Sequence, residues 1–116
     1  MIDKSIWLVE YATCTRQPVS SLVYGRHNEG TRTIPFTFLI VKSKDLITAI
    51  DTGCYDEGYG HVLNDRFAVD KVRPIEAALS DIDIKGDEVQ QVILTHAHYD
   101  HIGGMKAFPN AKFCIQ

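Results

Sequence analysis

Four side chains of the kinds that bind metal ions lie within six residues of one another. They are His96, His98, Asp100 and His101. Imidazole and carboxylate groups are the ligands that a divalent ion such as zinc accepts. So many of them in one short stretch indicate a metal site, because without a cation there is little reason to crowd them together. The alternative, a polar loop whose histidines cap a helix or face solvent, suits a single histidine better than this cluster.

The spacing of the four residues favours a loop over a helix. His96 and His98 are two positions apart, so in extended backbone both rings point to the same side. Positions 96, 98, 100 and 101 scatter around a helical wheel, so a single helix could not present all four groups together. Two groupings are open: His96 with His98 for one ion, and Asp100 with His101 for a second.

The segments on either side of the cluster determine where it lies in the fold. Residues 92–94 form a continuous apolar run, which predicts a strand buried on both faces. Thr95 marks the point where this strand leaves the core. After the cluster, Gly103-Gly104 allows a sharp turn into the next element.

The rest of the sequence alternates between strand and helix patterns. Short strands are expected at residues 6–9 and 22–24, and a hairpin at 36–42 and 46–51. The glycine-rich residues 53–60 predict a flexible connection. A short helix begins at Pro74, and its apolar positions follow helical spacing: Ile75, Ala78, Leu79 and Ile82. A second short helix before Pro109 and a strand at 111–116 complete a layered α/β architecture.

Two motifs resemble those of a known family. The pattern His96-x-His98-x-Asp100-His101, followed by two glycines, resembles the signature of the metallo-β-lactamase superfamily. The run Ile50-Asp51-Thr52-Gly53 is similar to that superfamily's other N-terminal motif, an acid-Thr-Gly at a strand end. The resemblance covers about residues 34–116. Within the superfamily, residues 37–116 are most similar to the N-acyl homoserine lactonase branch.

The resemblance implies an α/β fold: half of a four-layer αββα metallo-β-lactamase sandwich, a mixed sheet with helices on one face. Residues 1–116 would be the N-terminal part of a single domain, because superfamily members have two similar sheet-and-helix halves. The second half supplies a further His, Asp and His to the metals. A catalytic zinc keeps about three protein ligands, whereas this chain offers two per ion. We therefore expect an N-terminal half, truncated or completed by another polypeptide, that is inactive and poorly folded alone.

For function, the resemblance implies a hydrolase with two divalent metal ions, zinc before others, that opens a lactone or similar ester by attack of a metal-bound hydroxide. His96 and His98 would hold the first ion, and Asp100 and His101 the second. Asp100 would also be the catalytic residue that orients the nucleophile and passes its proton to the leaving oxygen. Enzyme alternatives are a thioesterase of the glyoxalase II type and a cyclic-amide hydrolase. The non-enzyme alternative is a metal-binding half-domain that docks to a partner.

Five further residues have two interpretations each. Asp51 either orients a ligand histidine from behind, as the resemblance implies, or bonds its own backbone in a turn. Tyr55, Tyr59 and Phe67 could form an apolar lip over the site and bind substrate, which an acyl chain would need. Equally, they could pack as ordinary loop aromatics. Tyr99 either packs beneath the site or points away from it.

Composition limits the partners. A 116-residue chain with 45% apolar and 23% charged residues is ordinary for a soluble globular domain. Its net charge of −3 offers no basic surface for nucleic acid, and no segment approaches the length of a membrane span. Three isolated cysteines, Cys14, Cys54 and Cys114, suit a reducing cytoplasm better than a disulfide framework. The expected partner is a small-molecule ester or lactone, and a homodimer is compatible with the sequence.

Overall fold

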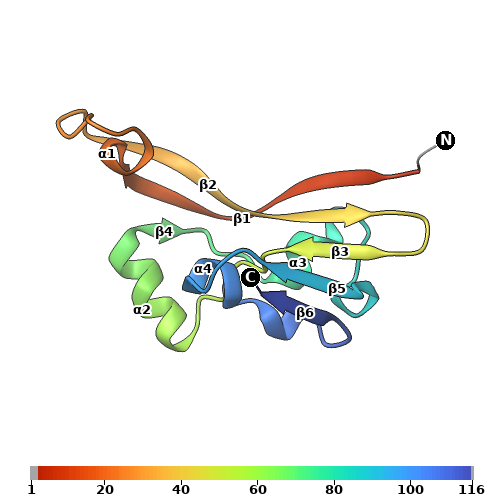
Figure 1. The fold of residues 1–116 in the computed structure, drawn as a ribbon. Helices are drawn as coiled ribbons and strands as arrows, with labels where there is room; N and C mark the ends of the chain where they lie inside the picture. Colours follow the sequence, from red (N-terminus) through yellow and green to blue (C-terminus); the bar gives the residue numbers. More distant parts are fainter. Residues whose placement is uncertain (1–2, 116) are drawn as a thin grey trace.

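The computed structural model describes residues 3–115, which form one mixed sheet with short helices packed against it (Figure 1). The strand order within these residues is β4-β1-β2-β3-β5-β6. The strands are β1 Ser5–Pro18, β2 Thr31–Lys42, β3 Ile47–Ile50, β4 Val69–Asp70, β5 Gln91–Leu94 and β6 Lys112–Ile115. The helices are α1 Val19–Leu22, α2 Gly58–Phe67, α3 Ile75–Ser80 and α4 Tyr99–Ile102, with 3₁₀ turns at Gly86–Glu88 and Met105–Ala107.

The sheet changes from antiparallel to parallel at β3. The long strands β1 and β2 run antiparallel across the whole molecule, and β3 returns along β2 as the predicted hairpin. β3 then pairs in parallel with β5, and β5 in parallel with β6. Because β3 and β5 are parallel neighbours, the segments that follow them leave the sheet at the same edge. That edge is where the histidine cluster lies.

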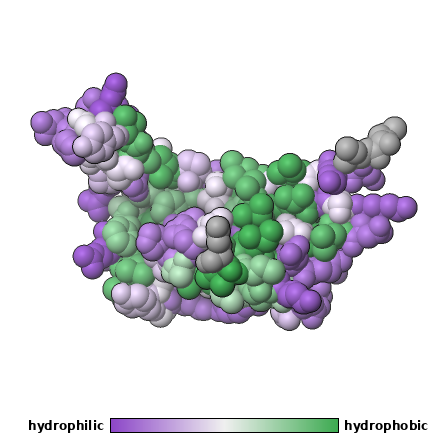
Figure 2. Space-filling model, viewed as in Figure 1, coloured by the Kyte–Doolittle hydropathy of each residue, from purple (hydrophilic) through white to green (hydrophobic). Residues whose placement is uncertain are grey.

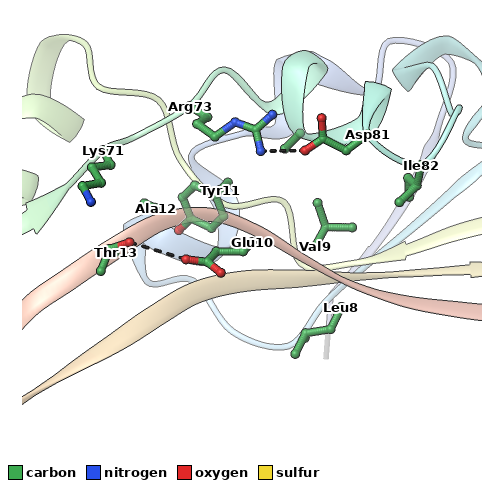
Figure 3. A pocket seen from close by; sticks show the side chains of 11 residues that line it. Leu8, Val9, Glu10, Tyr11, Ala12, Thr13, Lys71, Arg73, Asp81 and Ile82 are labelled. Atoms are coloured by element: carbon green, nitrogen blue, oxygen red, sulfur yellow. Dashed lines mark hydrogen bonds and ion pairs between the residues drawn. The ribbon is translucent and has the colours of Figure 1, made fainter.

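The two faces of the sheet are covered very differently. Side chains on the helix face are buried, as Phe38, Ile40 and Val92 illustrate. On the opposite face Leu8 is 67% exposed and Ile93 39% exposed. Figure 3 shows the division on β1, where Val9 lies on the side of α3 and Leu8 on the other side. The expectation that the strand at 92–94 is buried on both faces is therefore wrong, because Ile93 lies on the uncovered face.

The core lies between the sheet and the helices. Ile75, Ala78 and Leu79 of α3 are fully buried, as the spacing after Pro74 predicts. Phe108 follows the second 3₁₀ turn and is completely buried, with its ring edge-on to that of Phe38 at 6.4 Å between centroids. The segment that follows the histidine cluster is thus anchored in the same core as the central strands.

Two segments differ from the sequence-based expectation. Residues 22–24 are not a strand: α1 ends at Leu22, and Tyr24 is 99% exposed in the turn that joins β1 to β2. Strand β1 instead continues to Pro18, because it pairs with β2 on one side and with β4 on the other. The flexible connection expected at 53–60 is partly helical, since α2 begins at Gly58, and Cys54 within it is buried. Gly58 and Gly60 obscured this helix, because glycine disfavours helical backbone.

The surface in Figure 2 is hydrophobic over the middle of the molecule and hydrophilic at both ends of the long β1–β2 pair. Exposed apolar residues include Ile6, Leu8, Ile93 and Ile115. In residues 3–115 there is no helix with the length and apolar character needed to cross a membrane.

Phe108 provides a test of the core between the sheet and the segment after the cluster. We expect Phe108→Ala to lower the free energy of unfolding by roughly 3–5 kcal/mol, because a buried ring is lost and a cavity remains. Phe108→Leu keeps most of the volume and should cost less than about 1.5 kcal/mol. Denaturant unfolding measures both losses, and equal losses for Ala and Leu would contradict close packing at this position.

Candidate metal centre

The structure divides the histidine cluster between two backbone conformations. His96 and His98 lie in the irregular segment after β5, and His98 has extended backbone, with φ −68° and ψ 149°. Asp100 and His101 lie in the short helix α4. This division agrees with the expectation that no single helix presents all four groups.

The four side chains meet as two neighbouring pairs. His96 Nε2 lies 2.9 Å from His98 Nδ1, and His101 Nε2 lies 3.4 Å from Asp100 Oδ2. The rings of His96 and His101 are 4.0 Å apart between centroids, so the two pairs are adjacent. Across residues 3–115, no group of three or more His, Cys, Asp or Glu side chains is arranged to hold an ion. The His96 ring is closer to that of His101 than to that of His98, at 4.0 against 4.6 Å between centroids, so the division into two ion sites stays a prediction.

Asp51 connects the end of β3 to the cluster. Its carboxylate accepts hydrogen bonds from the Thr95 backbone N–H at 2.8 Å and from the Thr95 hydroxyl at 2.8 Å. His101 Nδ1 lies 2.7 Å from Asp51 Oδ2. A carboxylate at Nδ1 fixes the proton on that nitrogen and leaves the Nε2 lone pair free to bind a cation. Asp51 therefore contacts the neighbouring loop rather than its own backbone.

The environment of Asp51 stabilises its charged form. Burial alone would raise the pKa of this carboxyl group, but the hydrogen bonds from Thr95 and His101 outweigh it and lower the pKa below its usual value. The backbone of Asp51 is left-handed, with φ 64°. Such a conformation is uncommon outside glycine, so the bonds from Thr95 and His101 also hold this turn in shape.

Thr52 fixes the backbone of the loop from the other side. It is completely buried, and its backbone N–H and its hydroxyl both donate to the His101 carbonyl, at 2.9 and 2.8 Å. The Thr52 hydroxyl in turn accepts a hydrogen bond from the Gly104 N–H at 3.1 Å. A Cβ at position 104 would lie 2.1 Å from the Thr52 carbonyl oxygen, so only glycine fits there. Gly104 is therefore needed so that the backbone after the cluster can approach Thr52 closely, as well as for the turn.

A pocket of about 670 Å³ adjoins the cluster. Its walls come from the segment after β3, from α2 and from α4, and the lining includes Tyr55, Tyr59, Leu63, Phe67, His98, Tyr99 and Ile102. Tyr59, Leu63 and Phe67 are four residues apart and therefore share one face of α2. Leu63 and Ile102 were not singled out from the sequence. Leu63 was missed because the helix α2, which aligns it with Tyr59 and Phe67, was not predicted.

The aromatic residues of this pocket differ in how they are held. The Tyr55 hydroxyl donates to Glu76 at 2.6 Å, and Lys106 lies 4.1 Å from the centre of the Tyr55 ring. The ring of Phe67 stacks on that of Tyr99 at 6.3 Å between centroids. The Tyr99 hydroxyl is buried without a hydrogen-bond partner among the described residues. Tyr99 thus packs under Phe67, while Tyr59 is 75% exposed at the rim.

Thr52 offers a test of the backbone contacts. We expect Thr52→Val to lower the free energy of unfolding by roughly 1–3 kcal/mol, because it leaves the buried His101 carbonyl and Gly104 N–H with fewer partners. Thr33→Val is the matched control: Thr33 is exposed on β2, and this change should stay within about 0.5 kcal/mol. Denaturant unfolding of both variants measures the difference. Similar losses for the two would contradict a structural role for the Thr52 hydroxyl.

Known proteins share sequence and fold with this chain. The family model of the metallo-β-lactamase superfamily matches residues 30–116. Probable metallo-hydrolases of Mycobacterium tuberculosis and Mycobacterium bovis are each 34% identical to this chain over 88 residues. The match covers 66% of this chain but only 27% of the length of either relative.

Solved structures show the same fold at lower identity. A quorum-quenching N-acyl homoserine lactone lactonase has a TM-score of 0.74 and 20% identity. The alignment covers 97% of this chain and 45% of the lactonase chain. A probable metal-dependent hydrolase from Staphylococcus aureus has a TM-score of 0.71 and 21% identity, covering 97% and 47%. AidC, a dizinc quorum-quenching lactonase, has a TM-score of 0.68 and 19% identity, covering 97% and 42%.

These matches confirm the expected α/β fold with a mixed sheet. The chain spans less than half the length of these solved neighbours. Because the family model covers most of the chain and includes both motifs, the chain belongs to the metallo-β-lactamase superfamily.

Proposed function

We propose that this chain carries one side of the active site of a metal-dependent hydrolase that opens a lactone or similar ester. The site would hold two divalent metal ions, with zinc as the first choice. The observation that carries the proposal is the pairing of four ligand-type side chains at one sheet edge. His96 Nε2 faces His98 Nδ1, and His101 Nε2 faces Asp100 Oδ2. The chain spans under half of its structural neighbours, so further ligands would come from sequence beyond these residues.

The donor set suits two zinc ions with two of these ligands each. His96 and His98 would hold one ion, and Asp100 and His101 the other, while Asp51 keeps His101 Nε2 free of its proton. When bound, such ions polarise a carbonyl and lower the pKa of water from about 15.7 to about 7.

Asp100 would also act in proton transfer. Its Oδ2 lies 3.4 Å from His101 Nε2. Because the side chain is 23% exposed, water and substrate could also reach the carboxylate. A carboxylate in this position can orient the attacking water, take up its proton and pass that proton to the leaving alkoxide oxygen. The bond that breaks is the acyl C–O bond of the ester. In a lactone this opens the ring, and the single product is a hydroxy acid that carries both the hydroxyl and the carboxyl group.

The pocket beside the cluster favours a substrate that carries an apolar substituent. It adjoins His98 and is lined largely by aromatic and aliphatic side chains from α2 and α4. Apolar pockets with few polar groups select ligands by their shape and by the apolar surface that they can bury. AidC was solved in complex with the product N-hexanoyl-L-homoserine, an acylated molecule of the class that such a pocket fits. We therefore favour an acylated lactone over the alternatives, a thioester and a cyclic amide.

The proposal is tested on the full-length protein by elemental analysis together with a panel of lactones, thioesters and cyclic amides. We expect two equivalents of divalent metal and turnover that is selective for lactones. Selective thioester cleavage would move the assignment to the glyoxalase II type. Metal binding without hydrolysis of any substrate would favour the non-enzyme alternative, a metal-binding half-domain that docks to a partner.

Asp100→Asn tests the catalytic role directly. The amide keeps the size of the side chain but cannot accept the proton of the attacking water, so turnover in the full-length protein should fall by about 100-fold or more. Steady-state kinetics combined with metal analysis of the same sample measure the effect. A near-normal rate at full metal occupancy would refute the role assigned to Asp100.

Phe67→Ala tests the substrate pocket. Loss of the ring should lower kcat/KM for a decanoyl-substituted lactone by about 10-fold, and for a butanoyl-substituted one much less, because each buried methylene contributes about 0.8 kcal/mol. Val62→Ala is the matched control: Val62 lies on α2, is 56% exposed and does not line the pocket. If the two variants change the chain-length preference equally, the pocket does not bind the acyl group.

A further inference from the structure

Tyr11 reaches the histidine cluster from β1, a strand that carries none of the motif residues. It is 1% exposed, and its ring packs against those of Phe36 and Phe38, at 6.4 and 6.1 Å between centroids. Its hydroxyl donates a hydrogen bond to the backbone carbonyl of Asp100 at 3.1 Å. The two residues are 89 positions apart in the sequence, so this contact belongs to the tertiary fold and not to the loop itself.

The Asp100 carbonyl needs this donor because the helix stops too early to supply one. In a continuing α-helix, the N–H of residue 104 would bond to the carbonyl of residue 100. The Gly104 N–H instead donates to the Gly53 carbonyl at 2.8 Å and to the Thr52 hydroxyl at 3.1 Å. The last carbonyls of a helix have no partner within the helix and need donors from elsewhere. The Tyr11 hydroxyl takes the place of the missing amide.

A break in the strand register aims Tyr11 at the loop. Glu10 pairs with Thr37 and Ala12 with Phe36, so Tyr11 is the extra residue of a β-bulge. Bulges re-aim side chains and are common beside active sites. Here Tyr11 and Ala12 are both buried although they are consecutive, and Figure 3 shows both on β1 below Arg73. The Tyr11 carbonyl also accepts from the Arg73 N–H at 2.8 Å, which holds the bulge in place.

The ring of Tyr11 has little freedom to move. A Cβ on Gly53 would lie 2.9 Å from Tyr11 Cε1 and 2.9 Å from Ile75 Cδ1, so the glycine of the acid-Thr-Gly motif is packed against the ring. The His101 carbonyl is held by Thr52, and the preceding carbonyl by Tyr11. Two consecutive carbonyls of α4 are thus held by groups from different parts of the sheet.

We propose that Tyr11 is a positioning residue that fixes the backbone of Asp100, so that the Asp100 carboxylate and the His101 imidazole present their donor atoms together. The metal-binding part of this inference rests on the proposed function. The structural part of the inference, that the Tyr11 hydroxyl holds α4 in place, is independent of the proposed function. Loss of the hydroxyl should therefore loosen α4 locally and weaken the ion held by Asp100 and His101, while the ion held by His96 and His98 is retained.

The experiment uses Tyr11→Phe in the full-length protein, with Tyr24→Phe as the matched control. Both changes remove one phenol hydroxyl, but Tyr24 is 99% exposed. Amide hydrogen exchange of the metal-free protein should become about 10-fold faster in residues 99–104 of Tyr11→Phe, with β2 and β3 unchanged. Titration with Co²⁺ should show one of two ions bound about 10-fold more weakly, because groups that orient ligands typically change metal affinity by 10–100-fold. Tyr24→Phe should match the wild type in both measurements.

Two results would overturn the inference. Wild-type exchange in residues 99–104 together with wild-type Co²⁺ affinity would mean that the hydroxyl positions nothing. Uniformly faster exchange across the sheet, or a variant that does not fold, would assign Tyr11 to the core alone. If the wild-type protein binds no Co²⁺, the proposed function fails, and the exchange measurement by itself then decides whether Tyr11 holds α4.

Discussion

The candidate site depends on the parallel pairing of β3 with β5. Ile50 lies opposite Ile93 in this pairing, so the residues that follow the two strands leave the sheet side by side. The Asp51 N–H donates to the Ile93 carbonyl at 2.8 Å, and the Asp51 carboxylate then reaches Thr95 and His101. A shift of this register by one residue would turn Asp51 to the other face of the sheet. Every contact between the two motifs follows from this one pairing.

Backbone contacts hold the cluster more extensively than side-chain contacts do. The carbonyls of Asp100 and His101 and the N–H of Gly104 are all bonded to residues outside the cluster. These bonds fix the backbone that carries the cluster, which limits the conformational entropy that this segment can lose on binding a ligand. The opposite, uncovered face of the sheet is apolar at Ile6, Leu8 and Ile93.

The parts of the fold that depend on local sequence could be predicted, and those that depend on long-range contacts could not. The hairpin of β2 and β3 and the start of α3 at Pro74 follow from residue spacing. The helix α2 was missed because its glycines disfavour helix locally, although packing against the rest of the fold overrides that preference. The bulge at Tyr11 has no local signal, since it exists only through the register between β1 and β2. Burial of Ile93 was overestimated because an apolar run does not reveal which face has a covering layer.

The most direct test of the account is a zinc-soaked crystal of the full-length protein with data collected at the zinc absorption edge. Two anomalous peaks are expected, one between His96 and His98 and one between Asp100 and His101, with Asp51 still bonded to His101 Nδ1. Side chains that point apart, with no anomalous density between them at a saturating zinc concentration, would contradict the claim that this sheet edge holds metal ions.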